Sequence, residues 1–442
     1  MPSAAVLSSV SSHWRDLTIS FPKLWSHLRF EIGGKTGVER YDNEERQRCF
    51  RETNYHLDRA GKAPLTLAFL EVDIRDGVDL MPFDLALDAL CRRVGQWANI
   101  EFDLGRFFLE ANASTLRMIR GNLVNLQSYC SREGGIDHRW ATDFLGTCPS
   151  LQNVSLREWG RSRSFSLLPT LLPWNQLRSL SLATPSSPYS VFEMLGWCPN
   201  LESLTFWTYE SDPTWPQVRV EPASWSVHSL SIIIVDGYDT MIFQDFLQYV
   251  TLPHLASLDM NTLSITNEPT LSTKREKCLH DLIRRSSRSI TSLSPHHCPF
   301  TGEQAVDLLR LLPGLTYLYI DENMPVETVS TSNISIIYHE HLFDHLSVDP
   351  SSTTRPFLPR LTNLKIVVGS KAFPDKAFVK AIRSRWILDP ELSVRVGVDC
   401  IRSVEVSFND YPANVPDSLL RLEKLKKLGL GVSIPECRTS SS

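Results

Sequence analysis

Three histidines gather in one short segment, and their spacing is typical of a metal site. His341 and His345 are four residues apart, so a helix places both imidazoles on one face, where they can share a zinc ion; His339 lies just before them. The segment lacks the His-Glu-x-x-His signature of zinc peptidases, because Phe343 stands at its last position. Exposed histidines on a helix give the same pattern. We therefore expect no metal here and keep a metal hydrolase only as an alternative.

The other motifs that suggest chemistry are incomplete. His296–Cys298 has no second metal-binding pair at zinc-finger spacing. Gly33–Thr36 ends like a phosphate-binding loop, but Arg29 occupies the position where that loop needs its first glycine. Cys148 and Cys198 precede prolines at equivalent positions of a repeat, where cysteine serves as a small buried apolar residue. Since no Gly-x-Ser-x-Gly turn occurs either, we predict a protein that is not an enzyme and binds no cofactor.

Composition excludes several classes of protein. Of the 442 residues, 42% are hydrophobic and 21% are charged, which is typical of a folded chain and not of a disordered one. The net charge of −5 gives no general attraction for nucleic acid or for an anionic membrane. No apolar run approaches the ~18 residues of a membrane span. An odd number of cysteines, nine, and an N-terminus without a secretory signal predict reduced thiols in the cytoplasm or nucleus.

One apolar motif recurs along the chain and predicts its architecture. It consists of an apolar residue, two others, a second apolar residue, one other and a third apolar residue. Clear copies begin at Leu151, Leu177, Leu201, Val227, Leu255, Leu315, Leu361 and Ile401, and weaker copies begin at Trp97, Leu126 and Ile290. From Leu126 to Leu255 the copies begin 24 to 28 residues apart, which is the period of leucine-rich repeats.

The spacing within the motif has a physical reason. Its second and third apolar residues are two apart, so they share one face of a short strand, and stacked neighbours must bury that face. Helices return the chain between strands; the segment 307–312 is an example. Prolines that end the helix or turn stand two residues before five copies, at Pro149, Pro199, Pro253, Pro313 and Pro359. The predicted fold class is therefore α/β, a curved solenoid with parallel strands and with helices on its convex side.

The ends of the array are predicted from weaker signals. The alternation in Pro64–Phe69 predicts the first strand. The last helix is expected over 418–427, with Ser418 as its N-cap, and a closing strand is expected near 430–434. On that helix Leu422, Leu425 and Leu428 are expected to dock on the solenoid, while Arg421, Lys424, Lys426 and Lys427 form a solvated basic face.

Residues 1–32 do not fit the repeat. An amphipathic helix is predicted around Val10 to Leu17, then a turn begins at Pro22, and a charged helix over 44–60 ends at Gly61. The order Val-x-x-x-Trp-Arg-Asp-Leu, then Phe-Pro-x-Leu-Trp, resembles the second half of an F-box. Its form is that of mushroom-type fungal F-box proteins with leucine-rich repeats. The helix and strand after Tyr55 and the closing segment up to Ile434 resemble the same family.

The resemblance implies a division of the chain and a partner. Residues 1–32 are expected to be a partial, helical F-box, 33–62 a connecting helix, 63–434 the irregular repeat solenoid and 435–442 a disordered tail. The family implies substrate recognition for a cullin–RING (SCF-type) ubiquitin ligase. Its Skp-type adaptor would then contact Trp14, Leu17, Leu24 and Trp25.

The same four residues also suit local core packing. The family's opening Leu-Pro-x-Glu helix is not found before Trp14. A stand-alone leucine-rich-repeat scaffold without adaptor binding therefore remains the alternative.

The predicted target site lies on the strands. Residues between the apolar positions of each motif form the concave face, and most of them are small and polar. Tyr317, Tyr319 and Trp207 differ, because large amphipathic side chains dominate binding hot spots. We therefore expect an unidentified protein target to bind around Tyr317 and Tyr319, although ordinary strand tyrosines give the same pattern. Neither nucleic acid nor a membrane is an expected partner.

Overall fold

The computed structural model describes most of the chain. The described residues are 4–35, 43–72, 79–80, 84–103, 113–131, 144–156, 172–183, 188–208, 223–234, 246–262, 273–286, 289–298, 300–321, 338–351, 355–368, 373–408 and 417–434. They divide into two compact units. The first comprises Met1–Ser186 and Ser190–Leu201, and the second Ser187–Tyr189 and Glu202–Ser442. The expected tail at 435–442 lies outside the described residues.

The first unit contains a run of strands with helices or short 3-10 turns between them. Its helices are α1 (Ala4–Val10), α2 (Ser12–Ser20), α3 (Asn43–Ala60), α4 (Asp84–Cys91), α6 (Ala113–Met118) and most of α8 (Pro188–Trp197). The 3-10 turns are η1 (Pro22–Leu24), η2 (Val94–Gln96), η3 (Leu145–Thr147) and η6 (Trp174–Gln176). Its strands are β1 (His27–Lys35), β2 (Leu65–Val72), β3 (Asp79–Leu80), β4 (Trp97–Asp103), β5 (Ser128–Ser131), β6 (Asn153–Leu156) and β7 (Ser179–Ala183).

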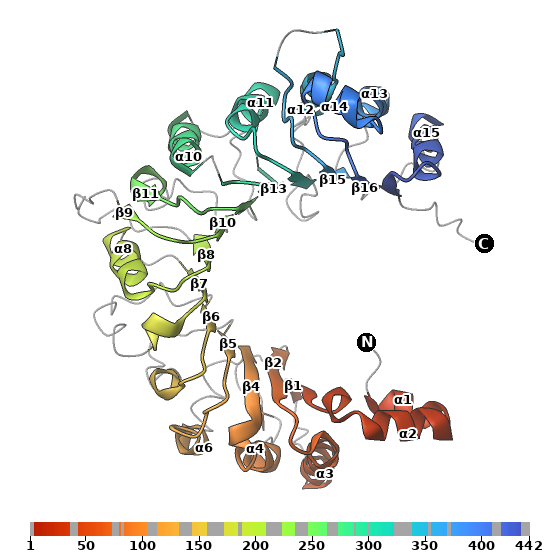
Figure 1. Cartoon of the computed structure of the whole chain (residues 1–442). Coiled ribbons are helices and arrows are strands. Elements are labelled where there is room, and N and C mark those ends of the chain that lie inside the picture. Colours follow the sequence, from red (N-terminus) through yellow and green to blue (C-terminus); the bar gives the residue numbers. More distant parts are fainter. Residues whose placement is uncertain are drawn as a thin grey trace. The chain divides into compact units, whose positions relative to one another are not determined.

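These strands form one sheet in the order β7-β6-β5-β4-β2-β1-β3, and every pair except β1–β3 is parallel. Helices α3, α4 and α6 lie on one side of it (Figure 1). The prediction that Pro64–Phe69 holds the first strand is wrong, because β1 precedes β2 in the chain and pairs with it. The expected division at residue 32 falls inside β1.

Strand β1 carries a copy of the motif that the sequence analysis missed. Trp25, Leu28 and Phe30 have the same spacing as Trp97, Ile100 and Phe102 of the β4 repeat. Both tryptophans are fully buried, and each indole N–H donates to a carbonyl seven residues earlier, Thr18 at 2.8 Å and Leu90 at 3.1 Å. The helix α2, the turn η1 and β1 therefore repeat the order of α4, η2 and β4.

An aromatic ladder fills the core of the first unit. The rings of Phe30 and Phe69 stack at 5.4 Å, Phe69 and Phe102 follow at 5.0 Å, and Tyr129 and Phe144 continue the series. Gly61, as expected, ends α3 with φ of 57°, a conformation that costs glycine little.

The second unit repeats the same architecture. Its strands are β8 (Ser203–Thr208), β9 (Ala223–Ser224), β10 (Ser229–Ile234), β11 (Val250–Thr251), β12 (Ser257–Thr262), β13 (Ser292–His296), β14 (Tyr317–Asp321), β15 (Asn363–Val368), β16 (Ser403–Phe408) and β17 (Gly431–Ser433). Its helices are α10 (Thr273–Ser286), α11 (Gly302–Arg310), α12 (Tyr338–Leu346), α13 (Asp375–Arg385), α14 (Pro390–Val396) and α15 (Asp417–Lys426).

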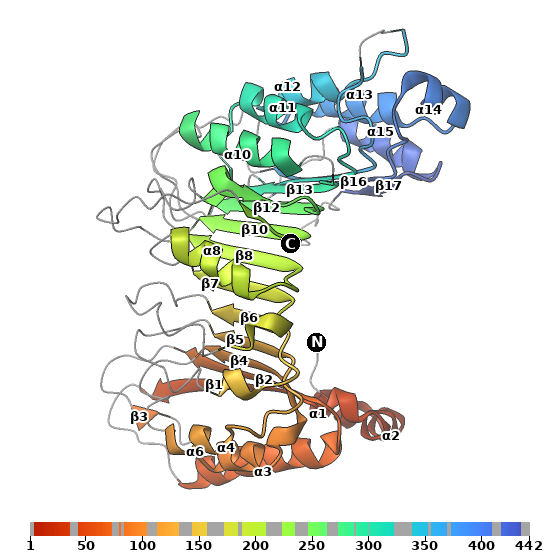
Figure 2. The same cartoon turned by 60° about the vertical axis from the view of Figure 1, so that its left-hand side comes forward.

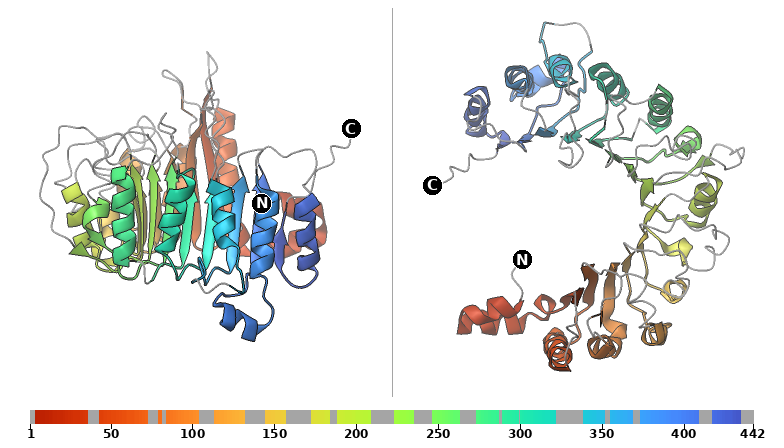
Figure 3. Two further views of the ribbon diagram at one scale, coloured as in Figure 1. Left: turned by 90° about the horizontal axis from the view of Figure 1, so that it is seen from above. Right: turned by 180° about the vertical axis from the view of Figure 1, so that it is seen from behind.

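The main sheet of the second unit runs β8-β10-β12-β13-β14-β15-β16-β17, with all of these neighbours parallel, and β9 pairs with β11 separately. Figure 2 shows β8, β10, β12 and β13 as successive rungs. Helices α10 to α13 and α15 lie on one side of this sheet, as the two views of Figure 3 also show in green to blue. We call the opposite side the helix-free face.

The structure confirms the repeats that the motif predicted. Strands β5 to β8, β10 and β12 to β16 each begin two residues after the first apolar residue of a copy. The second and third apolar residues point to the helices and are buried; Leu180, Leu230 and Leu318, for example, are fully buried. A tight turn precedes the strand in these copies. In the five that contain the proline, the first leucine N–H closes this turn by donating three residues back, as Leu315 does to Leu312 at 3.1 Å.

Successive repeats are joined by one recurring arrangement. The carbonyl of the residue before a strand accepts hydrogen bonds from two consecutive N–H groups of the next repeat. Thr291 accepts from Thr316 at 2.8 Å and Tyr317 at 3.0 Å, and Thr316 accepts from Thr362 and Asn363 at 3.0 and 2.9 Å. These shared carbonyls fix the register of each strand against its neighbour.

Two arginines secure the helices of the second unit through backbone carbonyls. Arg385, at the end of α13, donates to the carbonyls of Leu346 at 2.6 Å, Leu358 at 2.9 Å and Phe357. Arg285, on α10, donates to the carbonyls of Leu247 and Val250 in the same manner. A guanidinium can satisfy several carbonyls that would otherwise be buried without a partner.

Two expectations for the last helix are wrong. Ser418 lies inside α15 rather than before it, and its hydroxyl donates to Asp375 of α13. Leu422 docks on the array, but Leu428 is 63% exposed because the helix has ended two residues before it. The closing strand is present as β17. Among the residues that the structure describes, no helix has the length and apolar composition needed to cross a membrane.

Candidate functional site

The helix-free face of the second unit is built by strand alternation. In β14 the side chains of Leu318 and Ile320 point to the helices, so Tyr317, Tyr319 and Asp321 must point the other way. Because neighbouring strands pair in register, each of these positions continues as a row of residues across the sheet. One row contains Ser231, Asp259 and Ser294 and, on the strands beyond, Tyr319, Lys365 and Glu405; the next row contains Asn261, His296 and Asp321.

Tyr319 lies at the centre of a set of polar and aromatic contacts. Its hydroxyl donates to Asp321 Oδ2 at 2.9 Å, and the ring edge meets His296 with 4.6 Å between centroids. On the other side, Lys365 Nζ lies 5.0 Å from the centre of the Tyr319 ring and 3.0 Å from Glu405 Oε1. Burial, followed by the hydrogen bond to Asp321, raises the pKa of Tyr319, so the phenol stays protonated. Four strands thus contribute to one ordered surface.

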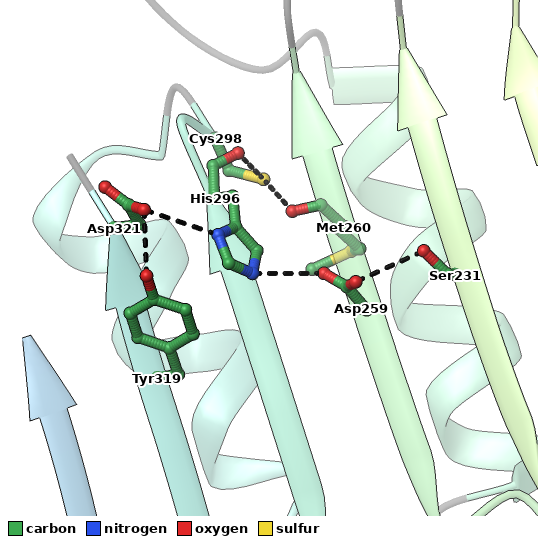
Figure 4. A network of polar contacts seen from close by, with 7 residues as sticks. All are labelled: Ser231, Asp259, Met260, His296, Cys298, Tyr319 and Asp321. Carbon is green, nitrogen blue, oxygen red and sulfur yellow. Dashed lines mark hydrogen bonds and ion pairs between the residues drawn. The ribbon is translucent and has the colours of Figure 1, made fainter. Parts of the chain in front are cut away.

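His296 joins two carboxylates from neighbouring strands (Figure 4). Its Nε2 is 3.3 Å from Asp259 Oδ1, and its Nδ1 is 3.5 Å from Asp321 Oδ2. The hydroxyl of Ser231 donates to Asp259 Oδ2 at 3.2 Å. Burial raises the pKa of Asp259, although His296 and the Ser231 hydroxyl act in the opposite direction. The cluster holds the imidazole between two carboxylates on the helix-free face.

A hydroxyl and a thiol lie in or next to the cluster. The Ser231 hydroxyl donates to the Asp259 carboxylate. Cys298 donates to the carbonyls of Met260 at 3.6 Å and His296 at 3.5 Å. Burial raises the pKa of this thiol to about 12, which leaves it un-ionised near neutral pH.

The structure brings together two of the three residues predicted for the target site. Tyr317 and Tyr319 are half-buried neighbours on β14. Trp207 lies in the same register row as His296, but β8 and β14 are four strand steps apart, about 19 Å at the usual spacing. The sequence analysis treated His296 as part of a metal-like cluster. Its position on the strand, two residues after Ser294, was the signal that places it on this face.

The histidines of α12 lie elsewhere. His341 and His345 are both exposed on that helix, and the His345 ring contacts Phe357 at 5.7 Å. Within the described ranges, no group of three or more His, Cys, Asp or Glu side chains is placed to hold a metal ion.

A second candidate surface lies in the first unit, on α1, α2 and η1. Seven large apolar side chains there are exposed, from 37% for Leu17 to 64% for Val10: Val6, Val10, Trp14, Leu17, Ile19, Phe21 and Leu24. We call these seven residues the N-terminal apolar surface. Helices α1 and α2 contact each other, and η1 joins them to α3. Figure 1 shows α1 and α2 near the end at which the chain enters β1, and they extend away from α3.

Trp25 does not belong to that surface. Its side chain has 0% exposure, and its ring contacts Tyr55 at 5.5 Å and His56 at 5.3 Å, with Arg59 over one side. The burial is against the prediction that Trp25 contacts an adaptor. Trp25 occupies the first position of the β1 repeat motif, which is why it is buried. Trp14, Leu17 and Leu24 are exposed and remain available to a partner.

Comparison with known proteins gives distant structural similarity alone. No family model matches the chain, and no curated protein matches it. Among solved structures the chain is similar to one in the crystal structure of the Rad7 and Elc1 complex in yeast, with 15% identity and a TM-score of 0.41. The alignment covers 84% of this chain and 84% of that one. A similarity at this level assigns neither function nor partner.

Proposed function

We propose that this protein is a non-enzymatic receptor subunit with two binding surfaces. The N-terminal apolar surface binds a Skp-type adaptor of a cullin–RING (SCF-type) ubiquitin ligase. The helix-free face around Tyr317 and Tyr319 binds the protein that is to be ubiquitinated. The single observation that carries the proposal is the set of seven exposed apolar side chains on α1, α2 and η1.

That surface is costly unless a partner covers it. Exposed apolar side chains scattered singly are normal, but a group rimmed by polar residues marks an interaction site. Here Trp14, Leu17 and Leu24 lie within eleven residues of each other, on two short elements that contact little of the array. Complete burial of a fully exposed side chain of this kind contributes roughly 1.5–3 kcal/mol, and a partner that covers this surface gains a share of that from each of its residues.

The resemblance of the N-terminal sequence supports an adaptor as that partner. Trp14 and Leu17 fall in the Trp-Arg-Asp-Leu string, and Leu24 falls in the Phe-Pro-x-Leu-Trp string. Within the second string the structure separates two roles. Leu24 is exposed, while Trp25 anchors η1 to α3. The Phe-Pro-x-Leu-Trp string therefore attaches α2 to the array through Trp25 and leaves Leu24 exposed for a partner.

The helix-free face supports the target-binding half of the proposal. Tyr317 and Tyr319 offer large contact area with few rotatable bonds, and Asp259, Asp321, Lys365 and Glu405 surround them with charges that are already paired. Because these contacts hold the side chains in place before binding, a partner loses less ordering entropy.

Co-purification tests the adaptor half. The full chain is expressed with a Skp-type adaptor and the N-terminal part of a cullin, beside a Trp14→Ala, Leu24→Ala variant. The matched control is Leu388→Ala, Val394→Ala, which removes two apolar side chains near and on α14 that are more exposed than Trp14 and Leu24. We expect the wild type and the control to retain the adaptor and the Trp14 variant to lose it, with unchanged thermal melting in all three.

Other outcomes have definite meanings. A folded wild-type chain that binds no adaptor contradicts the ligase proposal and favours the stand-alone scaffold. Equal retention by the Trp14→Ala, Leu24→Ala variant contradicts the assignment of the N-terminal apolar surface.

A further inference from the structure

A groove between α13 and α15 gathers positive charge on the helix side of the second unit. Its volume is about 350 Å³, and Lys376, Val379, Lys380, Arg383, Ser418 and Arg421 line it. The two helices are in contact and lie next to each other in Figure 1. Four of the six lining residues are cations from segments about 40 residues apart in the sequence, so only the fold brings them together.

Helical spacing aligns three of these cations. Lys376, Lys380 and Arg383 are separated by four and three residues, so they share one face of α13 over about 10.5 Å of helix. Arg421 faces them from α15, three residues after Ser418. All four side chains are exposed, whereas Val379 forms a buried apolar floor.

Four exposed arginines on or next to other helices are paired with acids one turn away: Arg48–Glu52, Arg92–Asp88, Arg284–Asp281 and Arg310–Asp307. None of the four groove cations forms an ion pair with a described residue. Asp375 is the one acidic residue in the sequence of α13, and its carboxylate accepts the hydrogen bond from Ser418.

Unpaired like charges one turn apart destabilise a helix. A bound anion removes that repulsion and gains charge-assisted hydrogen bonds, for which the two guanidinium groups of Arg383 and Arg421 are suited, because each can bind two oxygens of one phosphate. The groove is small, and the net charge of the protein is −5, so a single dianionic group fits better than a nucleic-acid strand.

We propose that the groove between α13 and α15 binds a phosphate group carried by a peptide segment of a partner protein. The site lies on the helix side of the sheet and does not depend on the proposed adaptor or target surfaces. Lys376 and Lys380 supply point charges at one end, and Arg383 and Arg421 supply directed hydrogen bonds at the other. The Val379 floor accommodates the apolar part of the phosphorylated side chain.

Fluorescence anisotropy with labelled peptides tests the proposal. The probe is a fluorescein-labelled Gly-Ala-Gly-phosphoserine-Gly-Ala-Gly peptide, compared with the same peptide containing serine. The full chain is measured at low and physiological salt, beside Lys380→Glu with Arg383→Glu. The control is Arg46→Glu with Arg51→Glu on α3, which makes the same change in net charge with two exposed cations far from the groove in the sequence.

We expect the phosphorylated peptide to bind at least tenfold more tightly than the serine peptide. The Lys380→Glu, Arg383→Glu variant should lose this preference, and the α3 control should keep most of it. Inorganic phosphate should compete. If the charge-reversed variant melts at a lower temperature, Arg421→Gln replaces it, since that change keeps a hydrogen-bonding side chain.

Three results would overturn the proposal. The first is equal affinity for the two peptides. The second is an equal loss in the α3 control, which would show that the general charge of the protein and not the groove attracts the peptide. The third is a single-stranded oligonucleotide that binds more tightly than the phosphopeptide and is displaced by the same groove variant, which would make the groove a nucleic-acid site.

Discussion

The helix-free faces of the two units share a backbone but differ in chemistry. In the first unit, one register row runs from His27 of β1 through Thr66, Asn99, Ser128, Asn153 and Ser179, and the last five are neutral and short. Asn99 donates to the Thr66 hydroxyl at 3.0 Å, so two of these side chains satisfy each other. In the second unit, the two rows that follow the equivalent position carry Tyr319, His296 and four charged side chains, Asp259, Asp321, Lys365 and Glu405, in contact across five strands.

The difference separates what the fold requires from what it permits. The repeats of both units have the same buried apolar positions and the same shared carbonyls. Stability therefore does not dictate which side chains occupy the exposed rows. A row of short serine and asparagine side chains offers a binding partner few anchors, whereas rows with aromatic and charged side chains offer many. We infer that recognition concentrates in the second unit.

The largest expected effect concerns a buried motif position that occurs in both units. Leu180 and Leu318 are fully buried at the same motif position, one in each unit. Replacing either by alanine removes apolar contacts and leaves a cavity, which should lower the free energy of unfolding by ~2–5 kcal/mol. Urea unfolding monitored by circular dichroism measures the loss, with Val394→Ala as the exposed control.

The comparison predicts similar losses for the two leucines. A change below ~1 kcal/mol for Leu180→Ala would mean that the small first-unit repeats are not packed as described. If the two units unfold in separate steps, each substitution should shift only the step of its own unit.

The next effect concerns the exposed rows. Tyr317→Ala with Tyr319→Ala removes the aromatic pair and the contacts to Asp321 and Lys365. Binding of a target isolated with the wild-type chain should weaken at least tenfold, which corresponds to about 1.4 kcal/mol, with little change in melting temperature. Calorimetry on the purified pair provides the measurement.

The matched substitution in the first unit is Ser179→Ala with Ser181→Ala, at equivalent positions of β7. Target affinity should be unchanged in that variant. Loss of affinity in the serine variant alone would place recognition in the first unit and reverse the comparison.

The smallest effect is a pH dependence that includes His297 of the second unit. Burial lowers the pKa of His297, so the folded state holds this imidazole neutral while the unfolded chain takes up a proton near the ordinary value of 6.5. The stability that His297 contributes is present above about pH 6.5 and is lost as the pH falls toward its folded pKa. Asp259, whose pKa is raised, acts in the opposite direction: stability falls as the pH rises above the ordinary carboxyl range.

His297→Asn isolates the histidine contribution. Asparagine tolerates the positive φ of 54° at this position and does not titrate. Urea midpoints at pH 7.5 and 5.5 should differ less in this variant than in the wild type. An identical difference in both proteins would show that His297 titrates alike in the folded and unfolded chains.

Much of the fold could be predicted from sequence because its motif is local. Six residues suffice to show an apolar position on a turn and two on a strand, so β5 to β8, β10 and β12 to β16 were found. Strand β1 carries the same spacing with Trp25, Leu28 and Phe30, but two of these residues are aromatic, and the segment was interpreted as part of an F-box. A local signal was present there and was assigned to another role.

The sites were less predictable because they depend on stacking. Tyr317 and Tyr319 could be found from residue type, since they stand out on their own strand. The link between His296 and two carboxylates joins residues from three strands, 25 to 37 residues apart, and no single segment shows it. The basic groove is of the same kind, because Arg383 and Arg421 meet only when α13 and α15 pack.

The shared carbonyls have a consequence for how such a chain can change over generations. Between Leu315 and Leu361 the chain takes 46 residues to complete one repeat, and yet Tyr317 pairs with Asn363 in the same register as in the shorter repeats. The extra length therefore lies between β14 and β15, outside both strands, and β15 resumes at its fixed point of attachment. Insertions between strands thus leave the register of the strands unchanged. A lineage can lengthen a connection while it rewrites the exposed strand residues one by one.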